Sequence, residues 1–285
     1  ACLLLVAKCW PKQIKAGASI RAGVDVNALS SCVPRVQNPA MLTSQFIGFD
    51  TAAMPFRDIL SGVFRDFVAE RYGAHLDRLE DLHRHVAEAD IAALYAAVYR
   101  CLGQPEFKAA YARLGRYLVE RFFAGKAAFQ CVPSIRIHLV NQKSVQYHTD
   151  EWYGHGPAVV NFWLPLVAVS GSYSMFVMEA AACEALTQVF EREAISMQEM
   201  NQRMRQQSRP LAMHYGQIFM FSSRLMHGTE LNQSAVTWIS FDFRILQNGA
   251  GRGVKADTIF ARPDEYDASL RTSGPAECRR KCGIV

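Results

Sequence analysis

Three residues have the types and the spacing of a metal site: His148, Asp150 and His227. His148 and Asp150 follow directly on a strand-like run, where residues two apart share a face, so both side chains can reach one ion. His227 ends a second apolar run and adds another imidazole. Two imidazoles and one carboxylate leave coordination positions open, an arrangement with which non-haem iron(II) holds a keto acid and dioxygen. A closed structural zinc site would require a fourth protein ligand.

A second His-x-Asp match, His75-Leu76-Asp77, lies in a segment that the apolar spacing predicts to be helical. Residues two apart in a helix point roughly 200° apart around the axis, so they cannot easily share an ion. We therefore expect this pair to be structural.

Arg244 follows His227 on a strand-like run that reads Trp238-Ile239-Ser240-Phe241-Asp242-Phe243-Arg244. A dicarboxylate co-substrate requires a cation opposite its far carboxylate, and the charge-assisted bonds of an arginine are worth about 1.5–3 kcal/mol each. We predict that Arg244 is this clamp. Ser240 shares its face of the strand and could add a hydroxyl donor, while Asp242 could hold the orientation of Arg244.

Four runs carry a resemblance to a known family: His148–Gly154, Asn161–Leu166, Met226–Gly228 and Ser240–Arg244. In this order they resemble the 2-oxoglutarate/iron(II) oxygenases related to phytanoyl-CoA hydroxylase. They are especially similar to a branch associated with carbohydrate and aminoglycoside biosynthesis. The resemblance covers roughly Pro133 to Leu246.

The resemblance implies a fold and a set of roles. It implies a double-stranded β-helix, Fe(II) bound by His148, Asp150 and His227, and 2-oxoglutarate clamped by Arg244, with Asn161 as a polar residue near the co-substrate. The reaction would consume O2, release succinate and CO2, and hydroxylate a C–H bond of a small polar metabolite such as a sugar or aminoglycoside. Halogenating relatives lack the carboxylate ligand, so Asp150 favours hydroxylation, while desaturation, epimerisation and ring closure stay open.

The substrate contacts are expected in two places. Glu151, Trp152 and Tyr153 follow the metal pair and predict a loop over the iron, where an aromatic ring can stack on a sugar and a carboxylate can bind hydroxyls or amines. Arg136 lies on the strand before the site and faces the same way as His138, so it could meet a substrate or a buried neighbour. A free amino acid or peptide-like metabolite is the alternative substrate class.

Two other classes of protein would use the same residues. A zinc hydrolase could hold its metal with the same three ligands, but hydrolysis needs no clamp such as Arg244. An inactive jelly-roll binding protein is the second alternative, because fold alone does not fix function. Loss of activity usually removes a ligand, and here the whole ligand set is present.

The composition limits the remaining possibilities. The chain has 285 residues, half of them hydrophobic, and a formal charge of +5 whose basic excess lies largely at the two ends. This is too dilute to predict a nucleic-acid partner. The apolar run Ala1–Ala7 is far shorter than the roughly 20 residues of a membrane span, so we expect no membrane partner. Eight scattered cysteines without a CxxC motif favour reduced thiols and a cytoplasmic location, and a homodimer is left open.

The period of the apolar residues divides the chain, which we expect to form a single domain. Residues 1–50 are predicted to be an N-terminal arm, and residues 51–125 a helical flank with helices from Thr51 to Gly73, Leu76 to Val86, Ile91 to Leu102 and Pro105 to Phe123. Residues 126–250 contain short period-two runs typical of a barrel or jelly roll, interrupted by a helical insert at 183–207. Residues 251–285 form a tail. The predicted fold is therefore mainly β with α: a jelly-roll or cupin-like core with flanking N-terminal helices.

Overall fold

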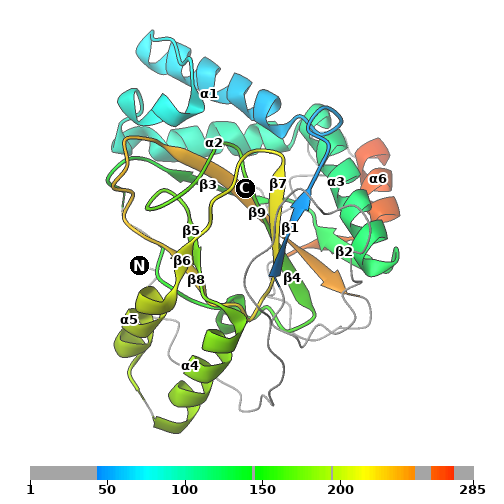
Figure 1. Cartoon of the computed structure of the whole chain (residues 1–285). Coiled ribbons are helices and arrows are strands. Elements are labelled where there is room, and N and C mark those ends of the chain that lie inside the picture. The colour runs from blue at the N-terminus through cyan, green and yellow to red at the C-terminus, as the bar shows by residue number, and fades with distance from the viewer. Residues whose placement is uncertain (1–43, 143–144, 194, 248–257, 273–285) are drawn as a thin grey trace.

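The computed structural model describes residues 44–142, 145–193, 195–247 and 258–272, and its centre is a pair of antiparallel sheets (Figure 1). The larger sheet has the order β1 (Ser44–Gly48), β7 (Gln217–Ser222), β4 (Val159–Pro165), β9 (Trp238–Gln247), β2 (Ala127–Gln130) and β10 (Phe260–Ala261), and β3 (Ser134–His138) also pairs with β9. The smaller sheet has the order β6 (Arg209–Pro210), β5 (Met175–Val177) and β8 (His227–Thr229).

The chain passes back and forth between the two sheets. After β3 in the larger sheet, the segment ending at His148 joins β8 of the smaller sheet through a bridge to His227. The chain then runs through β4 in the larger sheet, β5 and β6 in the smaller, β7 in the larger, β8 in the smaller and β9 in the larger. This interleaving is the topology of a double-stranded β-helix, which confirms the predicted fold.

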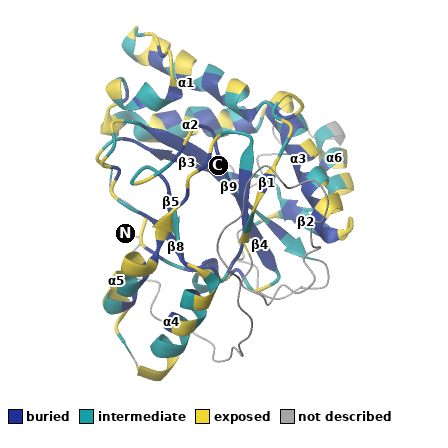
Figure 2. Cartoon of the chain, viewed as in Figure 1, coloured by how far each residue is buried: buried dark blue, intermediate teal, exposed yellow. Residues whose placement is uncertain are grey.

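Helices cover the outer face of the larger sheet (Figures 1 and 2). They are α1 (Phe56–Tyr72), α2 (Ile91–Leu102), α3 (Pro105–Phe123) and α6 (Pro263–Thr272), with 3₁₀ turns at Leu79–Arg84 and Glu88–Asp90. Phe241 and Phe243 point outward from β9 and contact rings of α1 and α3, including Phe56 and Tyr111. Because side chains alternate along a strand, Asp242 and Arg244 then point into the barrel.

Two of the predicted helices match the structure, namely Ile91–Leu102 and Pro105–Phe123. The first helix begins at Phe56 rather than after Thr51. Before it, the backbone N–H groups of Ala52 and Ala53 both donate to Oδ1 of Asp50, which closes a turn there instead of a helix. The helix ends as predicted at Gly73, whose φ of 61° suits glycine.

The helix predicted from Leu76 to Val86 was wrong. That segment forms only the 3₁₀ turn Leu79–Arg84. Its backbone is bound to the start of β9 instead: Glu80 O accepts a bond from Thr237 N at 2.7 Å, and His83 N donates to Thr237 Oγ1 at 3.0 Å. A tertiary contact therefore outweighs the local periodicity here.

The predicted insert is a pair of helices, α4 (Ala180–Glu193) and α5 (Met197–Gln207), beside the smaller sheet (Figure 1). Ser196 starts α5 by accepting a bond from Glu199 N. Arg205 of α5 forms an ion pair of 2.6 Å with Glu230, which also accepts a bond from Tyr147, the residue before His148. The insert is thus attached to the segment that precedes the metal pair.

The predicted N-terminal arm and C-terminal tail lie largely outside the described residues. Of the predicted arm only residues 44–50 are described, and they include β1; of the predicted tail only residues 258–272 are described, and they include β10 and α6.

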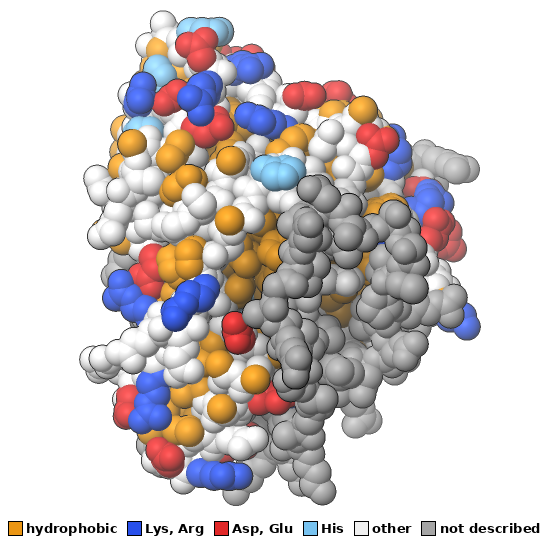
Figure 3. Space-filling view, in the orientation of Figure 1, with side chains coloured by type: hydrophobic (Ala, Val, Ile, Leu, Met, Phe, Trp, Pro, Cys, Tyr) orange, Lys and Arg blue, Asp and Glu red, His pale blue; other side chains and the backbone are white. Residues whose placement is uncertain are grey.

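Among the described residues, no helix is both long and apolar enough to cross a membrane. On the face seen in Figure 3, basic and acidic side chains are interspersed.

Gly115 lets α3 lie close to β2, because a Cβ at this position would lie 2.7 Å from the ring of Phe129. We expect Gly115→Ala to lower the free energy of unfolding by about 1–3 kcal/mol, since the methyl group must displace a fully buried ring. Gly62→Ala in α1 is the matched control. Nothing lies within 4 Å of its Cβ, so alanine should raise the free energy by about 0.5–1 kcal/mol. Urea unfolding measures both, and equal effects would contradict the close approach.

Candidate metal centre

The structure brings His148, Asp150 and His227 together, with their ligand atoms within 4.8 Å of one another. His148 and His227 face each other across a strand pair: each backbone N donates to the carbonyl of the other at 2.9 Å. Gly228 permits this approach, because a Cβ there would lie 2.9 Å from the backbone of Tyr147. Asp150 follows in a 3₁₀ turn (Asp150–Tyr153) that aims its carboxylate back at the histidines.

Both imidazoles are oriented for metal binding. The Nδ1 atom of His148 lies 2.8 Å from the carbonyl of Gln146, and that of His227 lies 2.8 Å from the carbonyl of Leu225. A carbonyl only accepts, so each Nδ1 must donate and each Nε2 keeps its lone pair for an ion. Burial, aided by His148, lowers the pKa of His227 to about 4, which keeps this imidazole neutral at neutral pH.

Asp150 forms a buried ion pair with Arg244, their side chains being 6% and 14% exposed. Arg244 donates from Nε at 3.2 Å and from Nη2 at 2.9 Å, both to Oδ2 of Asp150. Oδ1 instead faces His148, 3.6 Å from its Nε2. Burial alone would raise the pKa of Asp150, but Arg244 and the two histidines hold it well below its ordinary value. The site therefore offers two imidazoles and one carboxylate, the donor set that iron(II) accepts.

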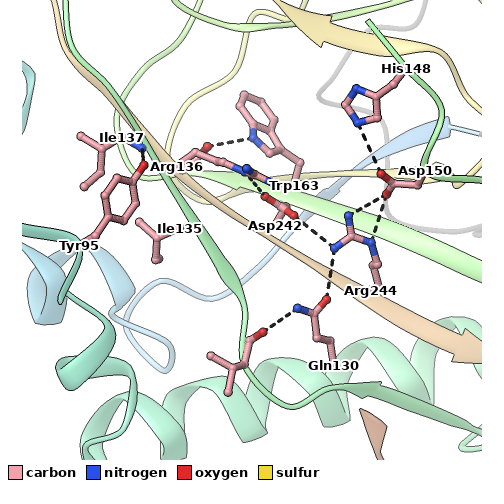
Figure 4. Close-up of polar contacts among 12 residues, drawn as sticks. Tyr95, Gln130, Ile135, Arg136, Ile137, His148, Asp150, Trp163, Asp242 and Arg244 are labelled. Carbon is pink, nitrogen blue, oxygen red and sulfur yellow. Dashed lines mark hydrogen bonds and ion pairs between the residues drawn. The ribbon is translucent and has the colours of Figure 1, made fainter. Parts of the chain in front are cut away.

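Charges alternate in a row from the metal centre into the barrel (Figure 4). Asp242 lies between two arginines: its Oδ2 is 3.5 Å from Nη1 of Arg244, and its Oδ1 accepts a bond of 2.9 Å from Nε of Arg136. Gln130 adds a contact of 3.4 Å to Nη1 of Arg244. The order Asp150, Arg244, Asp242, Arg136 gives every buried charge an opposite neighbour, as burial requires.

Two cavities meet at this row. An outer cleft of about 410 Å³ is lined by His148, Asp150, Arg244 and Arg136. An inner cavity shares these four residues and continues into the barrel. Several exposed large apolar side chains surround the outer cleft, namely Val145, Tyr153 and Ile259. The candidate ligand atoms thus lie where the two cavities meet, and the outer cleft is edged by exposed apolar side chains.

The inner cavity contains buried polar atoms that have no hydrogen-bond partner among the residues that the structure describes. Asn161 is 2% exposed, and neither its amide nitrogen nor its amide oxygen bonds to any of these residues. The same holds for Nε1 of Trp238 and Nδ1 of His138, whose rings stack at 4.2 Å. Burial lowers the pKa of His138 to about 4, and Arg136 contributes. Unpaired buried polar atoms cost free energy, so this cavity is built for a polar ligand.

The remaining predicted site residues are distributed over several environments. Arg136 and Tyr153 line the outer cleft, and Asn161 lines the inner cavity. Ser240 is fully buried and accepts a bond of 3.0 Å from Nε1 of Trp163, so its hydroxyl is turned to a core tryptophan. Glu151 lies 3.8 Å from Arg224, and Trp152 packs against the core; neither lines the two cavities.

Other residues near the site were not foreseen. Trp238 lies two residues before Ser240 on an alternating strand, so its inward direction could have been predicted. Gln130 comes from β2, and no local pattern signals its contact with Arg244. The pair His75 and Asp77 lies outside any helix, contrary to expectation, and both side chains are exposed, with Nε2 of His75 3.3 Å from Oδ1 of Asp77.

No protein-family model matches the sequence. The streptomycin biosynthesis protein StrG of Streptomyces griseus is 26% identical to this chain over 119 residues, which are 41% of this chain and 45% of that protein. The match thus spans less than half the length of this relative.

Solved structures with detectable similarity come from several enzymes. AviO1 from Streptomyces viridochromogenes is 11% identical, with a TM-score of 0.45 and coverage of 79% of this chain and 100% of that chain. The non-haem α-ketoglutarate-dependent carbocyclase SnoK from nogalamycin biosynthesis is 17% identical, with a TM-score of 0.40 and coverage of 81% and 87%. EctD from S. alaskensis is 12% identical, with a TM-score of 0.39 and coverage of 72% of each chain. Similarity at this level does not assign an activity.

We expect Arg244→Gln to destabilise the metal-free protein by about 3–5 kcal/mol, because the buried carboxylate of Asp150 loses its cation. A divalent ion at the three ligand atoms would supply that charge, so Mn(II) should raise the Tm of the variant more than that of the wild type. Calorimetry with and without Mn(II) measures both quantities. Arg203→Gln, which removes a helix-surface arginine paired with Glu199, is the control and should behave as the wild type. The same Mn(II)-induced shift in all three proteins would contradict the expected compensation.

Proposed function

We propose that this protein is an iron(II)- and 2-oxoglutarate-dependent oxygenase that acts on a small polar metabolite. The observation that carries the proposal is the convergence of His148, Asp150 and His227, with both imidazoles fixed through Nδ1 and both Nε2 atoms left for an ion. Iron(II) bound there would couple the conversion of 2-oxoglutarate and O2 to succinate and CO2 with insertion of the second oxygen atom into a substrate C–H bond.

The charges around the two cavities support a dicarboxylate co-substrate. Apart from the histidines, the charged residues that line the two cavities are Arg136, Arg244, Asp150 and Asp242, and the charges of these four residues cancel. A divalent cation would leave the site with two uncompensated positive charges in a partly buried space. A doubly charged anion restores neutrality, whereas a neutral co-substrate would not.

The protein's own residues would orient the reactants and exclude water. Arg244 holds one oxygen of Asp150, so the other oxygen stays turned toward the histidines. Phe221 packs on the His227 ring with centroids 5.0 Å apart and, with Trp163, lines the inner cavity with apolar surface. Such walls keep bulk water away from an oxidising centre and protect it from side reactions.

The outer cleft is the place for the primary substrate. Tyr153 lies at its edge, 48% exposed, and its ring contacts that of His148 with centroids 5.1 Å apart. An aromatic face beside polar groups suits a sugar-like ring. The partial similarity to a streptomycin biosynthesis protein supports a carbohydrate or aminoglycoside-like substrate for this chain. Hydroxylation is the proposed outcome, because Asp150 keeps the carboxylate ligand in place.

An anaerobic titration of the metal-free protein with Fe(II) and then 2-oxoglutarate tests the proposal. We expect a metal-to-ligand charge-transfer band in the wild type and succinate release when O2 and a suitable sugar or aminoglycoside are added. His227→Ala should abolish both signals, because it removes one of the three ligand atoms. The readouts are visible absorption and succinate quantification.

His214→Ala is the matched control, since His214 is exposed and its ring nitrogen Nδ1 lies 2.9 Å from the neighbouring Tyr215 carbonyl, away from the two cavities. It should retain the band and the succinate yield of the wild type. A folded wild type without a band, or a His227→Ala variant that keeps it, would overturn the proposed cofactor chemistry.

A further inference from the structure

We propose that Arg136, rather than Arg244, binds the far carboxylate of 2-oxoglutarate, inside the inner cavity. This inference rests on the proposed function and assigns its anion site. Arg244 would then act as a positioning residue for Asp150. Three features favour Arg136: its guanidinium has donors that are not engaged by Asp150, buried polar atoms surround it, and it lies at a suitable distance from the metal ligands.

Every nitrogen of Arg244 already has a partner. Nε and Nη2 contact Asp150, and Nη1 contacts Gln130 and Asp242. To bind a carboxylate as a bidentate fork, Arg244 would have to release Asp150 or break its other contacts. Removing the cation from a buried carboxylate is costly, so this exchange is unfavourable.

Arg136 is placed differently. Its Nε donates to Asp242, and within the described parts of the chain Nη1 and Nη2 form no hydrogen bond. Its side chain is 43% exposed, although it points into the barrel and lines both cavities. Asp242 holds the pKa of Arg136 above its ordinary value, so the guanidinium stays charged. A charged fork with two unused NH2 groups in a cavity is suited to a carboxylate.

Buried donors that have no partner within the described ranges of the chain lie in the same cavity. Trp238 offers an indole N–H, Asn161 offers an amide NH2, and the neutral His138 offers one ring nitrogen. A carboxylate has about four acceptor positions and can use several donors at once. A dicarboxylate that enters this cavity would therefore supply acceptors for these donors.

The register of the sheet gives a suitable spacing between the two arginines. Arg244 is opposite Asn161 at the level of the metal ligands, Asp242 is one strand repeat away along β9, and Arg136 is opposite Ser240 one repeat further. One repeat of two residues is about 7 Å, comparable with the length of an extended five-carbon dicarboxylate. Because Arg136 reaches back to Asp242, its guanidinium lies about one repeat from the level of Arg244.

The strand that carries Arg136 is held on both sides. One edge of β3 pairs with β9. On the other edge, Ile137 N donates to the hydroxyl of Tyr95 at 3.0 Å, and Ile135 N donates to the hydroxyl of Tyr99 at 3.4 Å, both from α2 (Figure 4 shows the first). A fixed backbone means that little conformational freedom is lost when an anion binds.

The test compares two keto acids of equal chain length: 2-oxoglutarate and 2-oxopentanoate, which has a methyl group in place of the far carboxylate. Binding to the Mn(II)-loaded protein is measured anaerobically by calorimetry and by tryptophan fluorescence, so the readout does not depend on turnover. We expect Arg136→Gln to weaken 2-oxoglutarate binding by roughly 10–100-fold and to change 2-oxopentanoate binding by less than about threefold. The preference for the dicarboxylate should largely disappear.

Two further variants sharpen the result. Arg244→Gln should affect both keto acids alike, because it acts through Asp150, and so it should keep the preference for 2-oxoglutarate. Arg136→Lys keeps a charge at the same position and should retain part of the preference, which gives a second readout if Arg136→Gln folds poorly. Arg203→Gln on α5 is the matched control and should bind both keto acids as the wild type does.

The outcomes separate this inference from the proposed function. If the Mn(II)-loaded wild type binds 2-oxoglutarate but Arg136→Gln and Arg136→Lys keep its full affinity, the assignment of Arg136 is wrong and the oxygenase proposal stands. Loss of the preference in Arg244→Gln instead would return the clamp to Arg244. A wild type that binds Mn(II) but not 2-oxoglutarate would overturn the proposed function itself.

Discussion

The ion pair between Asp150 and Arg244 is the interaction on which the rest of the site depends. A carboxylate that is 6% exposed must have a positive neighbour, and Arg244 supplies that charge at 2.9 Å. Asp242 contacts both Arg244 and Arg136, so the two arginines share one acidic neighbour. Removing Asp242 would therefore take a counter-charge from both arginines. In the barrel interior, each of these acidic side chains is therefore paired with a basic one.

β9 shows how one strand serves both packing and chemistry. Its outward residues, including Phe241 and Phe243, pack against the rings of α1 and α3 and are fully buried. Its inward residues Asp242 and Arg244 form the charge row. Because the strand period is two, a shift of one residue in the pairing would exchange these faces, so the aromatic packing also fixes the direction of the charged side chains.

The sequence was most informative where one local period decides the outcome. The strand period predicted the inward face of β9, and strong apolar spacing predicted α2 and α3 with their bounds. His148 and Asp150 do converge as predicted, but through an isolated bridge and a 3₁₀ turn rather than along the predicted strand. Local patterns failed where distant contacts decide. The backbone of residues 79–84 is shaped by Thr237, and the partners of Arg244 come from Gln130 and Asp150 on separate segments. Whether the buried amide of Asn161 finds a partner depends on every residue that lines the cavity, so the sequence around Asn161 could not predict it.

The tyrosines of α2 also affect how this sheet can associate with other chains. Within the described sheet, the side of β3 that faces away from β9 is an edge, and exposed edges of this kind recruit further strands and promote aggregation. Tyr95 and Tyr99 cover that edge by accepting the N–H groups of Ile137 and Ile135. A second chain that attempted to add a strand there would have to displace both hydroxyls, so the helix protects the molecule against edge-to-edge polymerisation.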